Sequence, residues 1–296
     1  MCHNFDMARF AGLDRRLDPY VSESNVERAH EILVAEQLGH GRRYSPGLSV
    51  VVLNRDAPEL LESVITGFVA AKPGFDAIQV GLELIVGDTG STDSRTLRLM
   101  AEAADVGVHV VSGLNYQFSE NNNELFSYVR RATTLFMNND VLLARNPGSL
   151  RVAYDAHVRS GDVVSVALDF ENGCVQHRGV DFLRDEHLWG LSFHPGAGMP
   201  ATHLMGEETV RPAVTGAFLM IDSELFDRVG GFDESYAAEC QDIDLCLKAH
   251  RLGVGCRVID AGQLVHLENA TRPKGEENWH DRQRFVRRWS SYIETI

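Results

Sequence analysis

The stretch Leu135-Phe136-Met137-Asn138-Asn139-Asp140-Val141 ends an apolar run abruptly in two amides and a carboxylate. Residues Thr133–Met137 have the length and composition of a buried strand. In open α/β sheets, ligands bind beyond the carboxyl ends of the strands. Because Mg²⁺ and Mn²⁺ prefer oxygen ligands and share them with substrate phosphates, an acid such as Asp140 at this place predicts a metal-diphosphate site.

Strand and helix patterns alternate on either side of this stretch. Runs rich in β-branched and other apolar residues predict strands at Leu48–Leu53, Leu82–Val86 and Val108–Val111. Helical patterns separate them, opening at Pro58 and spanning Ser94–Ala104 and Glu120–Arg131. The alternation predicts an α/β fold, a Rossmann-like, mostly parallel sheet flanked by helices.

The pattern changes outside this core. Residues Ser22–Leu38 have helical spacing and end at Gly39-His40-Gly41, which indicates an N-terminal helical extension. After Asp140 we expect a helix near Gly148–Arg159, a strand at Val163–Leu168 and a functional loop or flap from Glu171 to Pro212. We therefore divide the chain into an extension (1–46), a main domain (47–272) and a C-terminal helical tail (273–296).

Composition excludes several classes of function. The net charge of -14, from 28 Lys and Arg against 42 Asp and Glu, argues against nucleic acid as a partner, because a nonspecific polyanion binder needs a basic face. The five cysteines lack paired C-x-x-C spacing and are interpreted as reduced thiols. No signal-peptide core or membrane-spanning run is present, so we expect a cytoplasmic protein, with association at the inner face of a membrane left open.

Several polar positions follow predicted strands, and each has a structural and a functional interpretation. Asp88, Ser91 and Asp93 lie after the second strand, where they either bond a base or ribose or terminate the strand and cap the next helix. Asn54 is a turn former or a ligand contact. In Asn121-Asn122-Asn123, helix capping explains one asparagine but not three.

Two later segments add candidates. The helix from Glu239 to His250 begins with Asp242 and Asp244, which either complement the helix dipole or supply a general base. His266 follows a strand-like Gln263–Val265 and is a candidate metal ligand, although a lone histidine is more often structural. In the flap, Trp189 either lines an acceptor site or buries itself, and none of the surrounding histidines His177, His187, His194 and His203 is favoured.

Taken in order, these segments resemble family 2 glycosyltransferases of the GT-A fold. The resemblance covers Leu48 to Arg272 and rests on Asn54, Ile85–Asp93, Phe136–Asp140, Thr215–Phe218, Gly230–Glu234, Gln241–Cys246 and His266. Asn138-Asn139-Asp140 in place of Asp-x-Asp is similar to the branch with rhamnosyltransferases and other surface-polysaccharide enzymes. The segment Val175-Gln176-His177-Arg178-Gly179-Val180 adds to that similarity.

The resemblance implies a role for each matching residue. Nucleotide-sugar contacts are implied for Asn54, Asp88, Ser91, Asp93, Asn123, Asn138 and Asn139, and contacts with the donor or acceptor sugar for Thr215, Gly216, Ala217 and Trp189. Asp140 and His266 would hold Mn²⁺ or Mg²⁺. Asp242 would be the base, with Asp244 and Glu239 as alternatives because Gln241 stands where the family usually has Glu.

The implied activity is inverting transfer of a sugar from a UDP- or dTDP-sugar to a hydroxyl of a glycan, lipid-linked or other acceptor. Residues 47–140 would form the donor half and 141–272 the acceptor half. The alternatives are a noncatalytic nucleotide-sugar or glycan-binding module and a sugar nucleotidyltransferase, whose Gly-rich basic loop is absent from Asn54–Pro58. Phe285–Trp289 lacks the Gln of the Gln-x-x-Arg-Trp segment of processive relatives and is interpreted as an amphipathic basic tail helix. A homodimer is left open.

Overall fold

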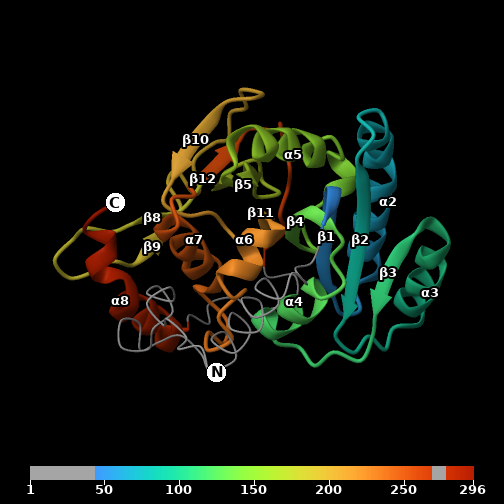
Figure 1. Ribbon diagram of the computed structural model, residues 1–296, viewed down its shortest axis with the longest axis horizontal. Coiled ribbons are helices and arrows are strands. Elements are labelled where there is room, and N and C mark those ends of the chain that lie inside the picture. Colours follow the sequence, from blue (N-terminus) through green and yellow to red (C-terminus); the bar gives the residue numbers. More distant parts are fainter. Residues whose placement is uncertain (1–43, 269–277) are drawn as a thin grey trace, which may run out of the picture.

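The computed structural model describes residues 44–268 and 278–296. The extension predicted at Ser22–Leu38, with its cap at Gly39-His40-Gly41, lies outside the described residues. The strands of the main sheet are β1 (Ser45–Asn54), β2 (Gly81–Asp88), β3 (Val108–Val111), β4 (Arg131–Asn138), β5 (Val163–Val166), β10 (Glu208–Arg211), β11 (Phe218–Asp222) and β12 (Cys256–Ile259). They lie in the order β10-β12-β5-β11-β4-β1-β2-β3 (Figure 1).

The sheet is mostly parallel, which confirms the predicted fold class. β1 pairs in parallel with β2 and β4, β2 with β3, and β5 with β12, whereas β11 and β10 run antiparallel to their neighbours. In this register Leu53 lies opposite both Gly87 and Asn138, and Asn54 lies opposite Asp88. The carboxyl ends of β1, β2 and β4 therefore meet at one edge.

Helices cover both faces of the sheet (Figure 1). One face packs against α2 (Pro58–Asp76), α3 (Ser94–Ala103) and α5 (Ser149–Ser160), and the other against α4 (Phe118–Phe126), α6 (Ser223–Arg228), α7 (Gln241–Arg251) and α8 (Trp279–Ile293). Successive β1 residues alternate between the two cores, with Val51 in one and Val50 and Val52 in the other. Burial of each such side chain contributes roughly 1.5–3 kcal/mol, which explains the apolar strands.

Several boundaries differ from the sequence-based expectation. The helix predicted at Glu120–Arg131 ends at Phe126, because Arg131 already begins β4. The strand predicted at Val163–Leu168 divides into β5 and β6 (Leu168–Asp169). Instead of a strand, Gln263–Val265 leads into isolated bridges that join Val265 to Asp169 and His266 to Val141.

The expected flap contains short strands of its own. They are β7 (Val175–His177), β8 (Asp181–Phe182) and β9 (Ser192–Phe193), followed by β10 of the main sheet. β6 pairs with β7 and β8 with β9. Within residues 44–268 and 278–296, no helix is long and apolar enough to cross a bilayer.

Helix α8 is part of the main core, whereas the segment Phe285–Trp289 was interpreted as a tail helix. Arg288 Nη1 lies 2.8 Å from Asp233 Oδ2 and 3.0 Å from Asp244 Oδ1. Trp289 Nε1 donates to the same Asp244 oxygen at 2.8 Å, and Lys248 Nζ lies 2.9 Å from Asp244 Oδ2. All five side chains are buried, so this ion cluster fixes α7 against α8 inside the protein.

The Arg288→Met variant should lose about 3–5 kcal/mol of unfolding free energy, because it leaves two buried carboxylates without their main cation. The exposed Arg287→Met is the matched control and should change little. Urea denaturation of both variants measures the difference. Equal stabilities would contradict a stabilising role for the cluster.

Candidate active site

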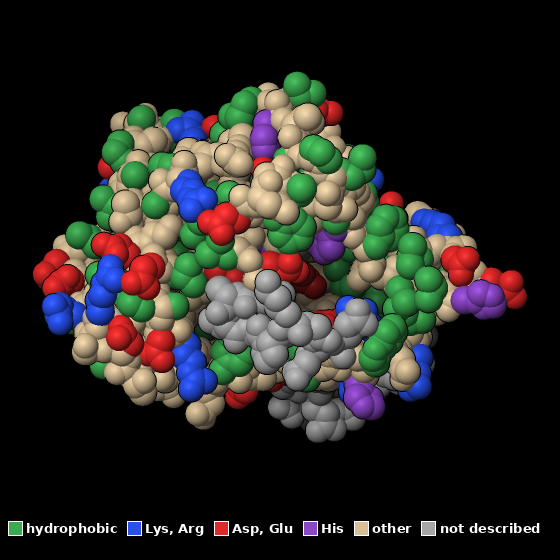
Figure 2. Space-filling view, turned by 180° about the vertical axis from the view of Figure 1, so that it is seen from behind, with side chains coloured by type: hydrophobic (Ala, Val, Ile, Leu, Met, Phe, Trp, Pro, Cys, Tyr) green, Lys and Arg blue, Asp and Glu red, His purple; other side chains and the backbone are tan. Residues whose placement is uncertain are grey.

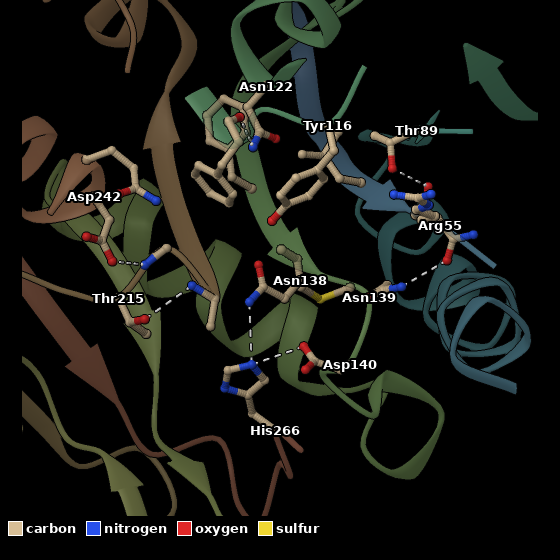
Figure 3. A pocket seen from close by; sticks show the side chains of 18 of the residues that line it. Arg55, Thr89, Tyr116, Asn122, Asn138, Asn139, Asp140, Thr215, Asp242 and His266 are labelled. Carbon is tan, nitrogen blue, oxygen red and sulfur yellow. Dashed lines mark hydrogen bonds and ion pairs between the residues drawn. The ribbon is translucent and has the colours of Figure 1, made fainter. Parts of the chain in front are cut away.

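A cavity of about 580 Å³ lies at the carboxyl ends of β1 and β4. Its lining includes nine of the predicted residues, namely Asn54, Asn138, Asn139, Asp140, Thr215, Gly216, Ala217, Asp242 and His266. Figure 3 shows Asp242 and Thr215 on one side, Arg55 and Asn139 on the other, and Asn138 with Asp140 and His266 between them. Acidic side chains gather in a hollow near the centre of the face drawn in Figure 2.

Asp140 and His266 form the clearest pair in this cavity. Asp140 lies in the turn after β4, and its Oδ1 is 3.0 Å from His266 Nε2. Backbone bonds bring the two segments together, since Leu267 N donates to Asp140 O and Leu142 N donates to Val265 O, at 3.1 and 2.8 Å. The other ring nitrogen, His266 Nδ1, lies 2.8 Å from Gln176 Oε1.

The geometry of this pair fits a divalent cation. Two neighbouring ligands of an octahedral ion at about 2.1 Å lie about 3 Å apart, which matches the separation of Asp140 Oδ1 and His266 Nε2. Among the described residues, no group of three or more His, Cys, Asp or Glu side chains is arranged to hold a metal. Asp140 and His266 would thus supply two ligands, with phosphate and water as the others.

The lining is also rich in negative charge. Four carboxylates, those of Asp56, Asp140, Asp242 and Glu268, accompany a single guanidinium, that of Arg55, among the described lining residues. These negative side chains repel the negative charge of an incoming diphosphate unless a cation lies between the carboxylates and the phosphates. Charge and geometry therefore both favour a metal at the Asp140–His266 pair.

Asp56 holds together the loops that follow β1 and β2. Its Oδ1 accepts from Thr92 N and Asp93 N at 2.7 and 2.8 Å, while Asp56 N donates to Ser91 Oγ at 2.8 Å. Asp56 and Ala57 both have a φ of 49°, in the left-handed region that costs energy for residues with a side chain. The contacts offset that cost and place Arg55 and Asp56 at the cavity.

Asparagines join the ends of the two central strands. Asn139 Nδ2 donates to Asn54 Oδ1 at 2.9 Å, and Asn54 Nδ2 donates to Asp56 O at 3.1 Å. Asn138 N donates to Ala217 O at 3.0 Å, which ties the end of β4 to the Thr215–Ala217 turn. Hydrogen bonds therefore fix the ends of β1 and β4 and the Thr215–Ala217 turn relative to one another at the cavity.

Asp242 lies in the first turn of α7, after Cys240, whose φ is 72°. Its Oδ2 accepts from Gly216 N at 2.6 Å and its Oδ1 from Ile243 N at 2.8 Å. Burial raises the pKa of Asp242 above its usual value. The two backbone donors lower the pKa, but their effect is smaller than that of burial. A carboxylate with a raised pKa that lines a cavity is suited to accept a proton.

The other two base candidates lie elsewhere. Asp244 is fully buried in the ion cluster with α8, where burial opposes its ionisation but Arg288 and Lys248 lower its pKa. Glu239 accepts from Asn278 N at 3.1 Å and from Arg282 Nε at 2.7 Å, so it caps and pairs with α8. Of the three acids, Asp242 is the one that lines the cavity.

Six predicted site residues are absent from the cavity lining, namely Asp88, Ser91, Asp93, Asn123, Trp189 and Asp244. Asp93 caps α3 through Thr96 N at 2.8 Å, and Asp88 Oδ1 accepts from Ser91 N at 3.0 Å. Asn123 Nδ2 donates to Phe232 O, and Asn123 Oδ1 accepts from Phe232 N, each at 2.9 Å. These side chains shape the loops around the cavity.

The sequence-based reasoning missed several lining residues, including Arg55, Asp56, Thr89, Tyr116, Phe118, Asn122 and Glu268. Tyr116 is 55% exposed and follows β3, so its place after a predicted strand was an available signal. Gln241 is 7% exposed and lines the cavity, yet its Oε1 is buried without a hydrogen-bond partner.

The two aspartates of α7 should respond oppositely to loss of charge. Because the pKa of Asp242 is higher in the folded than in the unfolded chain, ionised Asp242 lowers the free energy of unfolding once the pH exceeds the usual aspartate pKa. Asp242→Asn should therefore be equally or more stable at neutral pH. Asp244→Asn should be less stable by roughly 3–5 kcal/mol, because Arg288 and Lys248 lose their carboxylate. Thermal and urea unfolding at neutral pH test both, and a reversed order would contradict these placements.

No model of a known protein family matches the chain. It is 29% identical over 259 residues to the uncharacterized protein y4gI of Sinorhizobium fredii, covering 84% of this chain and 27% of that protein. It is 27% identical over 241 residues to the O-antigen biosynthesis protein RfbC of Myxococcus xanthus, covering 78% and 18%. The chain thus spans about a quarter of the length of the first relative and less than a fifth of the length of the second. A third, rhamnosyltransferase WbbL of Escherichia coli, is 26% identical over 200 residues, covering 60% and 72%.

Solved structures show the same fold. GalNAc-T7 with UDP, GalNAc and Mn²⁺ matches with a TM-score of 0.61 at 13% identity, over 84% of this chain and 50% of that one. The mannosyltransferase PcManGT of Pyrobaculum calidifontis, with GDP-Man and Mn²⁺, matches with a TM-score of 0.53 at 16% identity, over 92% and 73%. The chain therefore has the GT-A fold of these structures, and it is similar in sequence to a rhamnosyltransferase and to an O-antigen biosynthesis protein.

Proposed function

We propose that the chain transfers a sugar from a nucleotide-diphosphate donor, UDP- or dTDP-linked, to a hydroxyl of a glycan or lipid-linked acceptor, with inversion. The observation that carries this proposal is the meeting of three side chains in one cavity, Asp140 and His266 as a pair 3.0 Å apart and Asp242 as a half-buried carboxylate with a raised pKa. The likeness to a rhamnosyltransferase and to an O-antigen biosynthesis protein supports the reaction class.

The reaction is a single displacement at the anomeric carbon. The acceptor hydroxyl oxygen forms a bond to that carbon, its proton passes to the Asp242 carboxylate, and the bond from the carbon to the diphosphate oxygen breaks. The nucleoside diphosphate leaves with the bonding electrons, and attack opposite the leaving group inverts the configuration. Mn²⁺ or Mg²⁺ held by Asp140 and His266 would supply charge stabilisation to the departing diphosphate.

The nucleoside end of the donor fits the wall with Arg55, Thr89 and Tyr116. Tyr116 presents an exposed ring to the cavity, and aromatic faces stack on bases without requiring a particular base. The amide of Asn139, which donates to Asn54 Oδ1, lies between Arg55 and Asp140 (Figure 3). A donor laid across it would place its diphosphate at Asp140.

The sugar end fits the opposite wall, which is formed by Thr215, Gly216, Gln241 and Asp242. Gln241 is 7% exposed and completes this wall beside Asp242. Gly216 keeps this wall close to the base, because a Cβ there would meet the Asp242 Cβ at 3.2 Å. These contacts would orient the acceptor hydroxyl toward the Asp242 carboxylate.

Nucleotide release from UDP-, dTDP- and GDP-sugars, measured with and without Mn²⁺, tests the activity. We expect metal-dependent release from at least one donor, and Asp242→Asn should slow it by about 10²–10⁴-fold, because general-base help has that magnitude. Asp242→Asn should still bind the donor. Donor binding without release in the native chain would favour a noncatalytic binding module, and no binding of any donor would overturn the proposal.

Tyr116 should contribute to donor affinity through its ring. Tyr116→Ala should weaken binding of the active nucleotide by about 5- to 150-fold, which corresponds to roughly 1–3 kcal/mol of stacking. Tyr116→Phe keeps the ring and should bind nearly as the native chain does. Titration calorimetry with the free nucleoside diphosphate measures both, and equal weakening by the two variants would point to the hydroxyl instead.

A further inference from the structure

Gln176 is a buried amide in β7 that touches His266 twice. Its Oε1 lies 2.8 Å from His266 Nδ1, and its Nε2 donates to the backbone oxygen of His266 at 3.4 Å. The Gln176 side chain is 8% exposed and does not line the cavity. It therefore lies behind the histidine, on the side away from the metal pair.

These two contacts determine where the proton of His266 lies. The backbone oxygen accepts hydrogen bonds and never donates them, so the amide nitrogen of Gln176 must face it. The amide oxygen then faces Nδ1, and because that oxygen accepts as well, Nδ1 must carry the hydrogen. In a neutral imidazole the hydrogen at Nδ1 leaves Nε2 with a free lone pair.

The lone pair at Nε2 points to the cavity side. Asp140 Oδ1, itself an acceptor, lies 3.0 Å away, and Asn138 Nδ2 lies 3.4 Å away (Figure 3). Two acceptors this close repel each other unless something positive lies between them. A proton on Nε2 or a divalent cation removes the repulsion, and the cation would use both atoms as ligands.

We propose that Gln176 is a positioning residue that holds His266 in the Nδ1–H tautomer, so that Nε2 and Asp140 Oδ1 together face a divalent cation. The inference rests on the metal site of the proposed function. Side chains behind a metal-bound histidine commonly fix its tautomer and ring orientation in this way. Gln176 would thus act on the metal without touching it.

The tautomer can be measured without metal or substrate. Nitrogen-15 NMR of the histidine rings of the full chain, at mildly alkaline pH, distinguishes a protonated Nδ1 from a protonated Nε2. We expect Nδ1–H for His266 in the native chain. In Gln176→Leu the acceptor is lost, and the hydrogen should move to Nε2, where Asp140 accepts it.

Metal affinity gives a second readout. Electron paramagnetic resonance of free Mn²⁺, with and without UDP, should show binding about 10- to 100-fold weaker in Gln176→Leu, the usual cost of losing a partner behind a metal ligand. Gln176→Glu keeps an acceptor at the same place and should restore most of the affinity. Gln263→Leu makes the same chemical change at an exposed position and should bind Mn²⁺ as the native chain does.

The outcomes separate this inference from the proposed function. Nε2–H in the native chain, or a tautomer and Mn²⁺ affinity unchanged in Gln176→Leu, would overturn the positioning role even if sugar transfer is observed. Nδ1–H that is lost in Gln176→Leu supports that role. If such a native chain binds no Mn²⁺ with or without UDP, the metal in the proposed function is overturned instead, and with it the purpose of the tautomer.

Discussion

The candidate site depends on the register with which β1 pairs with β2 and β4. Because Leu53 lies opposite both Gly87 and Asn138, the three strands end at the same level, and their following loops meet. A slip of one residue would turn every β1 side chain to the opposite face and would break the two apolar cores. The same burial that stabilises the sheet therefore fixes the distance between Asn54 and Asn139.

Much of this arrangement follows from the sequence, because strand ends are readable. The apolar runs before Asn54 and Asn138 predict parallel strands, and parallel strands deliver the residues after them to one edge. Asp140 and His266 were paired through the resemblance to glycosyltransferases, and they lie 3.0 Å apart. The fold class was predicted for the same reason, since helical and extended periods alternate through the first half of the chain.

The remaining placements depend on contacts between distant segments. Asp244 was grouped with Asp242, yet two helical steps turn a side chain by about 200°, so the two acids face opposite sides of α7. What Asp244 meets there is Arg288 of α8, which no local pattern reveals. Asn123 likewise serves the turn at Phe232. Short polar side chains suit both a ligand and a loop, and their type alone does not separate the two uses.

Asp242 and Asp244 also show two environments for a carboxylate, one half-buried and one fully buried. Asp244 is surrounded by cations and hydrogen-bond donors, which favours its charge and links two helices. Within the described residues Asp242 has backbone donors and no ion-pair partner, and burial raises its pKa, so it keeps an affinity for protons. The first arrangement stabilises the fold, and the second accepts a cost in stability to keep a reactive group.

The ion cluster between α7 and α8 has a consequence for the order of events during synthesis. The segments that carry Asn54, Asp140 and His266 are all synthesised before α8. Until Arg288 and Trp289 have been added, Asp244 lacks two of its partners, and α7 lacks part of the surface on which it packs. Helix α8 thus completes the surroundings of Asp244, whereas the contacts of Asp242 with Gly216 N and Ile243 N do not involve α8.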